Sequence, residues 1–104
     1  MIYELKTYTV RPDRMQDCIR AYDEEGYAYF KPYEDRLLGY FTTEVGPLNR
    51  LVQVWKFDGH EERQAMLDNL RADPGFGRFA GRLAPMFQDR EAVLMKPAPF
   101  ARCV

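Results

Sequence analysis

The stretch Leu38-Gly-Tyr-Phe-Thr-Thr-Glu-Val-Gly-Pro-Leu-Asn-Arg-Leu-Val-Gln-Val-Trp55 predicts a β-hairpin. Aromatic and β-branched residues lie on both sides of Gly46-Pro47-Leu48-Asn49, which is typical of two strands joined by a turn. We place the strands at residues 37–45 and 50–57, with a register that stays open by one residue. Polar residues such as Glu44 and Gln53 are interleaved with large apolar ones, an arrangement that suits a lined pocket or a subunit interface.

A strand and a helix are predicted before the hairpin. Residues 2–10 are rich in β-formers and predict the first strand. Arg11-Pro12-Asp13 predicts a helix start, because proline is favoured in a first turn and aspartate complements the helix dipole. Pro32 predicts the end of this helix near Phe30 or Lys31. Its apolar face comprises Met15, Cys18, Ile19, Tyr22, Gly26, Tyr29 and Phe30.

Two helices and a last strand are predicted after the hairpin. Asp58 followed by Glu61 is similar to a capping box and predicts a helix to about Arg71. The pair Asp73-Pro74 predicts the start of a further helix, and residues 91–96 predict the last strand. The residues expected to face inward are Ala65, Met66 and Leu70 on the first helix and Phe76, Phe79, Ala80, Leu83 and Phe87 on the second.

This order of elements predicts a ferredoxin-like α+β fold. Strand, helix, strand, strand, helix pair, strand is the split βαβ pattern with four strands in one antiparallel sheet. A length of 104 residues suits one domain over residues 1–104. The helices can cover only one face of the sheet, so we expect an identical chain to cover the other and form a homodimer through the sheet faces. The apolar residues behind this expectation are Leu51, Val52, Val54, Trp55 and Phe57.

The composition argues against several classes of partner. The 15 basic and 16 acidic side chains nearly cancel and are spread along the chain, so we expect neither nucleic acid nor membrane as a partner. Cys18 and Cys103 have no spacing typical of a disulfide framework, and no signal peptide or transmembrane run is visible. We therefore expect a cytoplasmic protein. Seven Phe, seven Tyr and one Trp are many for so small a domain, which favours a subunit interface.

Counting residues removes several chemistries. The chain has no serine, which excludes a Ser-His-Asp hydrolase, and its single histidine, His60, with two distant cysteines argues against a metal site. His60 in a first helical turn is interpreted as a surface residue, although counting alone leaves haem ligation open. Gly75-Phe-Gly77-Arg-Phe-Ala80 matches G-x-G-x-x-A but follows a helix rather than a strand, so we interpret it as accidental. We expect no metal or nucleotide cofactor.

The sequence resembles the NIPSNAP family, small domains of the dimeric α+β barrel superfamily. The resemblance covers nearly the whole chain in order. Its first and most specific motifs are Ile2-Tyr3-Glu4-Leu5-Lys6-Thr7-Tyr8 and Gly39-Tyr40-Phe41-x-Thr43-Glu44-x-Gly46-Pro47-Leu48-Asn49. Further along it includes Trp55, Arg63 and Lys96-Pro97-Ala98-Pro99-Phe100. Relative to the family pattern, Gln53 stands where His is frequent, Phe57 where Tyr is frequent, and Lys6 where Arg is frequent.

The resemblance implies a cavity between the sheet and its helices and little about chemistry. Related folds house cofactor-independent monooxygenases, isomerases and haem-degrading enzymes in such a cavity, but a fold does not fix a function. Eukaryotic members of the family are associated with mitochondria and with vesicle or mitophagy roles, and bacterial members have no assigned reaction. With no transit peptide before Met1, we do not expect mitochondrial targeting here.

Polar side chains on the predicted sheet are the candidate site. Glu4, Lys6 and Tyr8 share one face of the first strand, and Gln53 shares a face with Trp55. The competing interpretation is structural, with cross-strand or intersubunit ion pairs among Glu4, Lys6, Glu44 and Arg50. The aromatic cluster of Tyr27, Tyr29, Phe30 and Tyr33 is likewise more typical of a core or an interface than of a ligand platform, and Cys18 is more typical of a core than of a nucleophile.

Two hypotheses from different classes follow. In the first, a dimeric protein binds or transforms a small apolar or aromatic molecule, and the pocket is lined by Tyr8, Tyr40, Gln53 and Trp55. Proton abstraction would then require a desolvated Glu4 or Glu44. In the second, the protein is a non-catalytic dimerisation or protein-interaction module, and the same polar residues are structural.

Overall fold

The computed structural model describes the whole chain, Met1 to Val104, and contains the predicted four-stranded antiparallel sheet. The strands are β1 (Ile2–Val10), β2 (Leu37–Thr42), β3 (Arg50–Phe57) and β4 (Phe87–Met95), in the spatial order β2-β3-β1-β4. This order is that of a ferredoxin-like sheet and confirms the predicted α+β class. Strand β2 ends three residues before its predicted end at residue 45, and β4 begins four residues before its predicted start at residue 91.

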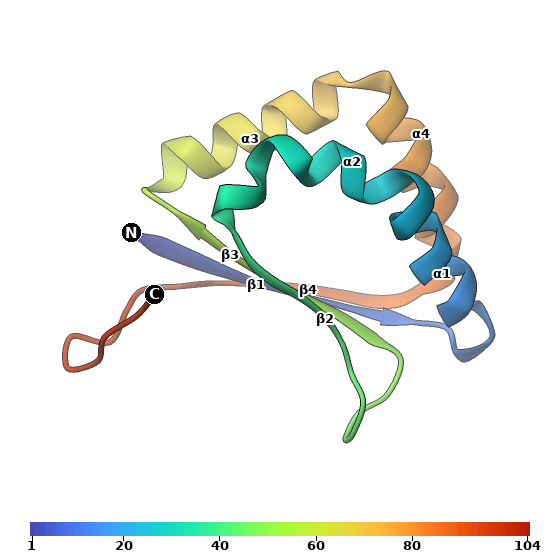
Figure 1. Cartoon of the computed structure of the whole chain (residues 1–104), viewed down its shortest axis with the longest axis horizontal. Coiled ribbons are helices and arrows are strands. Elements are labelled where there is room, and N and C mark those ends of the chain that lie inside the picture. The colour runs from blue at the N-terminus through green and yellow to red at the C-terminus, as the bar shows by residue number, and fades with distance from the viewer.

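The segment between β1 and β2 is one helical arm that changes type along its length. It comprises η1 (Pro12–Arg14), α1 (Met15–Ala21), the π-helical segment η2 (Tyr22–Gly26), α2 (Tyr27–Phe30) and η3 (Lys31–Arg36). The α-helical part ends at Phe30, as Pro32 predicts, although Lys31 before the proline keeps α-helical dihedral angles and the arm continues as the 3-10 segment η3. The arm lies along one side of the same sheet face that the remaining helices cover (Figure 1).

Helices α3 (His60–Ala72) and α4 (Pro74–Leu83) follow the hairpin, and η4 (Ala84–Met86) leads into β4. The side chain of Asp73 caps α4 by accepting a hydrogen bond from the Gly75 amide over 2.8 Å, as predicted. The predicted capping box at Asp58 and Glu61 is wrong. The residue before α3 is Gly59. Glu62, rather than the predicted Glu61, reaches back and accepts a hydrogen bond from the Asp58 amide over 3.0 Å.

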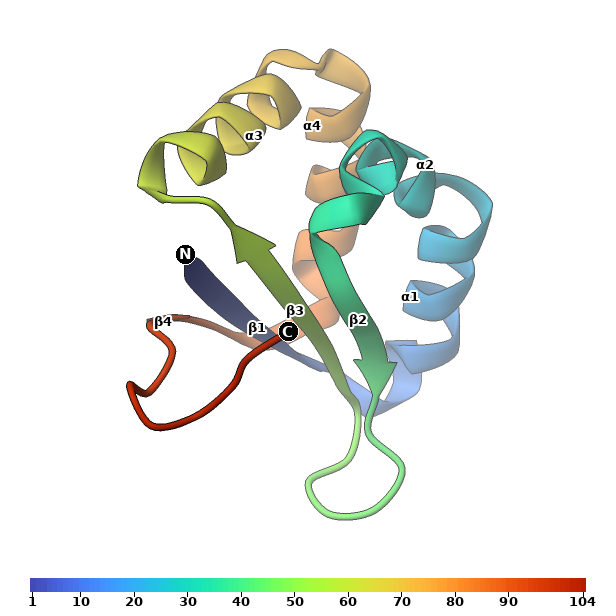
Figure 2. The same cartoon turned by 60° about the vertical axis from the view of Figure 1, so that its left-hand side comes forward.

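All helices lie on one face of the sheet and leave the other face without a layer (Figures 1 and 2). Along β3, Leu51, Gln53, Trp55 and Phe57 are buried beneath the helices, whereas Val52 and Val54 lie on the opposite, open face. The predicted placement of all five apolar residues of this strand on the face away from the helices is wrong for Leu51, Trp55 and Phe57. The hairpin register, Tyr40 opposite Gln53 and Phe41 opposite Val52, decides which residues share each face.

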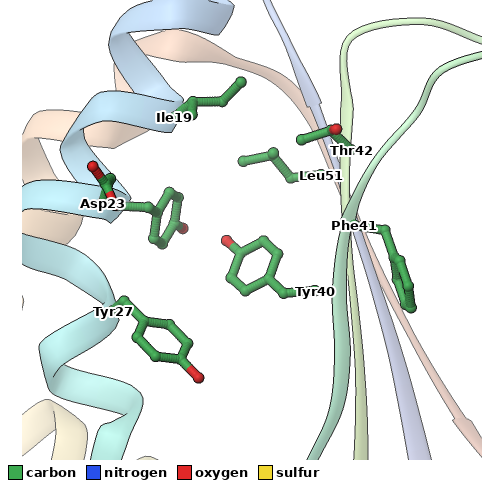
Figure 3. A pocket seen from close by; sticks show the side chains of 8 residues that line it. Ile19, Asp23, Tyr27, Tyr40, Phe41, Thr42 and Leu51 are labelled. Atoms are coloured by element: carbon green, nitrogen blue, oxygen red, sulfur yellow. The ribbon is translucent and has the colours of Figure 1, made fainter.

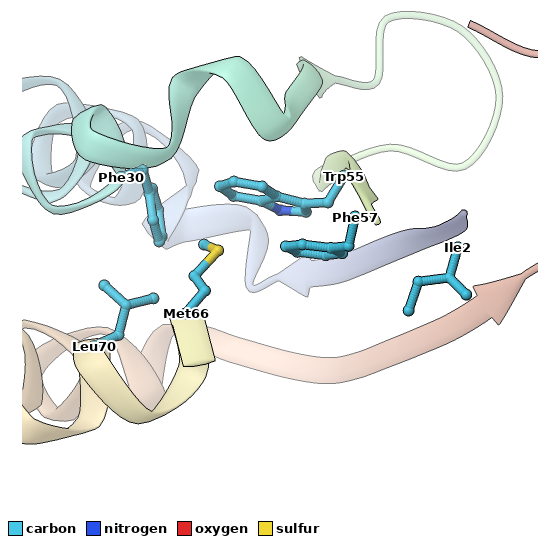
Figure 4. Packing of buried hydrophobic residues seen from close by; sticks show 6 residues of the cluster. All are labelled: Ile2, Phe30, Trp55, Phe57, Met66 and Leu70. Carbon is cyan, nitrogen blue, oxygen red and sulfur yellow. The ribbon is translucent and has the colours of Figure 1, made fainter. Parts of the chain in front are cut away.

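The core lies between the sheet and the helices in two clusters. The first comprises Ile2, Phe30, Trp55, Phe57, Met66 and Leu70 (Figure 4). The second comprises Val10, Cys18, Leu51, Phe79 and Leu83. Cys18 is fully buried, and burial raises the pKa of its thiol to about 11, in line with a core residue. Ala65 and Ala80, predicted to face inward, are exposed because only two positions of each helix reach the sheet deeply.

The open face carries apolar side chains and the C-terminal tail. Phe41 and Val93 are 55% and 38% exposed there. Tyr3 is covered instead, because residues 96–104 fold back over it and its hydroxyl donates to the carbonyl oxygen of Val104 over 2.6 Å. None of the helices combines the length and the apolar character that a membrane crossing requires.

Candidate functional site

Three strands present a row of polar side chains to the helices. The register places Tyr40 of β2 opposite Gln53 of β3, and Gln53 opposite Lys6 of β1. The next row pairs Leu51 with Tyr8 and Tyr8 with Arg90 of β4. Because side chains alternate along each strand, all of these residues point to the helix-covered face. The sheet thus brings together polar groups that are up to 84 positions apart in the chain, from Lys6 to Arg90.

Gln53 is held in one orientation by two hydrogen bonds. The indole nitrogen of Trp55 donates to Oε1 of Gln53 over 2.8 Å, and Nε2 of Gln53 donates to the hydroxyl of Tyr40 over 3.2 Å. Gln53 and Trp55 are only 2% and 1% exposed. An indole can only donate, so Oε1 must face Trp55, and the amide NH2 group must face Tyr40. The Trp55–Gln53–Tyr40 chain therefore fixes the polar centre of the sheet.

A cavity of about 280 Å³ lies between this centre and the helices α3 and α4, and we call it the inner cavity. Ten of its 14 lining residues are hydrophobic, if Tyr8 with its aromatic ring is counted among them. The apolar lining comes from the helical arm, from both helices and from the start of β4: Tyr22, Phe30, Leu67, Leu70, Phe76, Phe79, Ala80, Leu83 and Phe87. Its polar lining consists of Lys6, Tyr8, Gln53, Arg71 and Arg90. An apolar cavity with a few convergent polar groups is the usual form of a small-molecule site.

Burial shifts the proton equilibria of the two titratable groups that β1 contributes to the inner cavity. Desolvation lowers the pKa of the Lys6 ammonium below its ordinary value of 10.5; the carboxylate of Glu4 opposes this change, and the charges of Arg63 and Arg71 add to it. Desolvation raises the pKa of the Tyr8 phenol above 10.0. Tyr8 also stacks on Phe87 with ring centroids 4.9 Å apart, which fixes its ring at the cavity wall.

Glu4 is close to this site but is engaged elsewhere. Its carboxylate is buried and accepts two hydrogen bonds from the guanidinium of Arg63 on α3, over 3.0 Å and 2.6 Å. Nζ of Lys6 lies 4.0 Å from its other oxygen. This arrangement ties the first strand to α3, because a buried carboxylate requires charged or hydrogen-bonding partners. Glu4 does not line the inner cavity.

A second hollow, the side groove, lies between the helical arm and β2 and also has a volume of about 280 Å³ (Figure 3). Ile19, Asp23 and Tyr27 line it on the helical side, and Tyr40 points into it from the sheet, whereas Phe41 points away to the open face. Tyr22 lines both hollows.

The aromatic wall between the two hollows is packed tightly. Tyr22 contacts Tyr40 and Phe79 edge to face, at centroid distances of 5.4 Å and 5.3 Å. A Cβ atom on Gly26, at the end of the π-helical segment, would lie 2.2 Å from Cζ of Phe79. Glycine is therefore required where the arm approaches α4, and a π-helical segment of this kind is frequent at functional sites.

The structure brings together only part of the predicted pocket. Of the residues predicted to bind a ligand, Tyr8 and Gln53 line the inner cavity. Tyr40 contacts Gln53 but lines the side groove. Trp55 is buried in the first core cluster and is connected to the site only by its hydrogen bond to Gln53. Glu44 lies exposed in the loop after β2, so it is not desolvated and does not join the site.

Arg71 and Arg90 were missed by reasoning from sequence. Arg71 is in the last turn of α3 and Arg90 lies four residues into β4, outside the predicted strand. The available signal was the antiparallel pairing of the first and last strands, which brings Arg90 beside Tyr8. His60 is the first residue of α3. It is exposed and lines neither the inner cavity nor the side groove.

The fold and the cavity identify the structural class of this protein. A four-stranded antiparallel sheet with helices on one face is a ferredoxin-like α+β domain, and here it carries a partly polar cavity between the two layers. A solved antibiotic biosynthesis monooxygenase has this fold, with a TM-score of 0.65 at 18% identity over 95% of this chain and 100% of that one. At this identity the likeness establishes the fold alone.

Within this class, the chain belongs to the NIPSNAP family, whose model matches residues 3–102. It is similar to a NIPSNAP family protein from Agrobacterium tumefaciens, with 29% identity, a TM-score of 0.87, and coverage of 96% of this chain and 95% of that one. It is also similar to a NIPSNAP domain protein from Burkholderia xenovorans, with 31% identity, a TM-score of 0.86, and coverage of 99% and 100%.

A curated relative extends the family to a longer protein. The mouse protein NipSnap homolog 3B, from Mus musculus, is 26% identical over 72 residues. These residues amount to 68% of this chain and 28% of the mouse protein, so the chain spans less than a third of that relative's length.

Proposed function

We propose that this protein is a cytoplasmic homodimer that binds a small molecule with an apolar or aromatic body in the inner cavity and holds or transforms it without a metal or nucleotide. The observation that carries this proposal is the lining, in which ten hydrophobic residues surround the fixed amide of Gln53 and the ammonium of Lys6. A volume of about 280 Å³ is close to the lower end of the range for ligand pockets.

The polar groups of the cavity are preorganised, which favours binding. Gln53 cannot rotate without breaking its hydrogen bonds to Trp55 and Tyr40. Tyr8 is stacked on Phe87, and Lys6 is flanked by Glu4. A ligand therefore meets polar groups whose orientation is already fixed, and little conformational entropy is lost when it binds.

If the bound molecule is transformed, the groups available for proton transfer are Lys6 and Tyr8. The Lys6 ammonium, whose pKa is lowered, gives up its proton more readily than an ordinary lysine, which suits a general acid. Glu4, the other acid-base candidate of the first strand, has one oxygen bound to Arg63 and does not line the cavity. Substitution of Lys6 by Met is expected to abolish a reaction in the inner cavity and to leave the fold intact.

Native mass spectrometry of the gently purified protein tests the binding proposal. We expect protein that carries extra mass from a retained small molecule, and we expect Ala80→Trp, which obstructs the solvent-exposed rim of the inner cavity on α4, to lose that mass. Ala65→Trp is the matched control, because Ala65 is exposed on the neighbouring helix and does not line this cavity. Wild-type protein that is always empty and gains no thermal stability from any compound of a small-molecule library would contradict the proposal.

The homodimer is proposed from the open face of the sheet. Val52 and Val54 of β3, with Phe41 of β2 and Val93 of the edge strand β4, form an apolar surface that no helix of the chain covers. A second copy would cover it face to face, as in other packed sheets. Sedimentation velocity should give a dimer that Val54→Arg converts to a monomer. A monomeric wild type would overturn this part of the proposal.

The same open face favours a second candidate, a non-catalytic dimerisation or protein-interaction module. In that case the inner cavity is only an imperfection of packing, and Gln53 is a structural residue. The two candidates differ in the effect of Ala80→Trp, which should leave assembly unchanged in both but should abolish ligand retention only in the first.

A further inference from the structure

The charge distribution of the inner cavity is one-sided. Its lining includes three cationic side chains, Lys6, Arg71 and Arg90, and no carboxylate. The buried carboxylate of Glu4 lies outside this lining; it accepts its short hydrogen bonds from Arg63, and its other oxygen is 4.0 Å from Nζ of Lys6. The guanidinium groups of Arg71 and Arg90 form no ion pair or hydrogen bond, and only the backbone amide of Arg90 donates to Asp89. Most other arginines of the helices form ion pairs, with distances such as 2.8 Å from Arg36 to Glu62.

These three cations come from three different elements and meet at one cavity. Lys6 is on β1, Arg71 is in the last turn of α3, and Arg90 is on the edge strand β4. The Lys6 side chain is mostly enclosed, with 22% exposed, whereas Arg71 and Arg90 are exposed and therefore lie toward solvent. An anion at this position would be met from the cavity interior by an ammonium and from the solvent side by two guanidinium groups.

We propose that the ligand of the inner cavity is an organic carboxylate, with its anionic group between Lys6, Arg71 and Arg90 and its apolar body against Phe76, Phe79 and Leu83. This inference rests on the proposed binding function and adds the charge of the ligand to it. Guanidinium groups bind carboxylates in a bidentate geometry, and such charge-assisted hydrogen bonds are stronger than neutral ones.

The cations also disfavour the alternatives. After desolvation and the opposing effect of Glu4, the charge of Arg71 also contributes to the lowered pKa of Lys6, so these two cations of the lining are close enough to repel each other. An anion relieves this repulsion, a neutral ligand leaves it unchanged, and a cationic ligand increases it. Because the cavity is largely apolar, these differences are less screened than on an open surface.

Isothermal titration calorimetry with matched probes tests the inference. The probes are 2-naphthoate, 2-naphthalenemethanol and 2-naphthylmethylamine, together with octanoate, octanol and octylamine, so that the two series distinguish an aromatic from an aliphatic body. We expect one carboxylate to bind at least about tenfold more tightly than its own alcohol and its own amine. The double variant R71Q/R90Q should lose most of this preference, and R78Q, an exposed arginine of α4 outside the inner cavity, should keep it.

The outcomes separate the two proposals. Equal affinity for acid and alcohol, lost in Ala80→Trp, would overturn the carboxylate inference and leave the binding function standing. Tighter binding of an amine would overturn the inference in the same way. A carboxylate preference that survives in R71Q/R90Q would also overturn it, because the anion would then bind elsewhere. No binding by any of the six probes, together with protein that purifies empty, would overturn both.

Discussion

The guanidinium of Arg63 donates two hydrogen bonds to the carboxylate of Glu4, over 3.0 Å and 2.6 Å, and joins α3 to the first strand. Glu4 is 1% exposed and Arg63 is partly exposed, so the pair closes one side of the layer between sheet and helices. This relationship engages the Glu4 carboxylate outside the inner cavity, whereas Lys6, beside it, faces that cavity.

Loss of the guanidinium should destabilise the fold. Arg63→Gln leaves the buried carboxylate of Glu4 with only Lys6 at 4.0 Å, and we expect a loss of roughly 2–3 kcal/mol, less than for a fully buried pair because Arg63 is partly exposed. Arg20→Gln removes a surface pair at 3.9 Å from Asp17 and should cost less than about 1 kcal/mol. Urea unfolding measures both, and equal losses would contradict a structural role for the Arg63–Glu4 pair.

Removal of the amide at the centre of the sheet should also be costly. Gln53→Leu leaves the buried indole nitrogen of Trp55 and the hydroxyl of Tyr40 without a shared partner, and we expect a loss of about 2–3 kcal/mol. The matched control is Gln64→Leu, because Gln64 bonds only to Asp68 on the surface of α3. Trp55 is the only tryptophan, so its fluorescence follows unfolding directly. An unchanged unfolding midpoint in Gln53→Leu would show that the hydrogen bonds of the Trp55–Gln53–Tyr40 chain contribute nothing to stability.

The contact between the helical arm and α4 requires a glycine. Gly26→Ala would place a Cβ atom 2.2 Å from the buried ring of Phe79, and the resulting overpacking should cost roughly 1–3 kcal/mol. Gly81→Ala adds a methyl group where no atom lies within 4 Å, and it should be neutral or stabilise α4 by up to about 1 kcal/mol. Thermal unfolding of the two variants compares them, and opposite signs are expected. A stable Gly26→Ala variant would mean that the arm lies farther from α4 than described.

The tyrosines of the aromatic wall should resist ionisation. Burial raises the pKa of Tyr22 and of Tyr40 far above the ordinary 10.0 of a phenol. Because the unfolded chain loses these protons near 10.0, the folded state binds more protons above that pH, and the free energy of unfolding must fall as the pH rises further. An ultraviolet titration of phenolate should therefore show late ionisation that coincides with unfolding, and Tyr40→Phe should make the alkaline loss of stability less steep. Ionisation of all seven tyrosines near 10.0 without unfolding would contradict the packing.

Local signals in the sequence were sufficient for the fold. Proline and aspartate marked the helix boundaries at Phe30 and Asp73, and the order of elements predicted the sheet. The hairpin register could not be obtained in this way, because a shift of one residue keeps the same composition while it exchanges the two faces. The alternation of Leu51, Gln53, Trp55 and Phe57 inward became visible only with the strand pairing.

The candidate site was predicted less completely than the fold. Tyr8 and Gln53, which line the inner cavity, could be named from the sequence because polar residues interrupt apolar strands there; that they bind a ligand stays a prediction. Arg71 and Arg90 looked like ordinary surface arginines, and their place at the cavity depends on how α3 and β4 pack against β1, which no local pattern contains. Trp55 was assigned to the pocket because it shares a strand face with Gln53, but its large ring reaches Phe30 and Phe57 in the core instead.

The location of a bound carboxylate tests the central claim most directly. Amide chemical shifts of isotopically labelled protein should be followed by NMR while octanoate or 2-naphthoate is added. We expect the largest changes at Lys6, Tyr8, Gln53 and Leu83, which line the inner cavity, and almost none at Ile19 and Tyr27 of the side groove or at Phe41 of the open face. Changes concentrated in the side groove or on the open face would contradict the account.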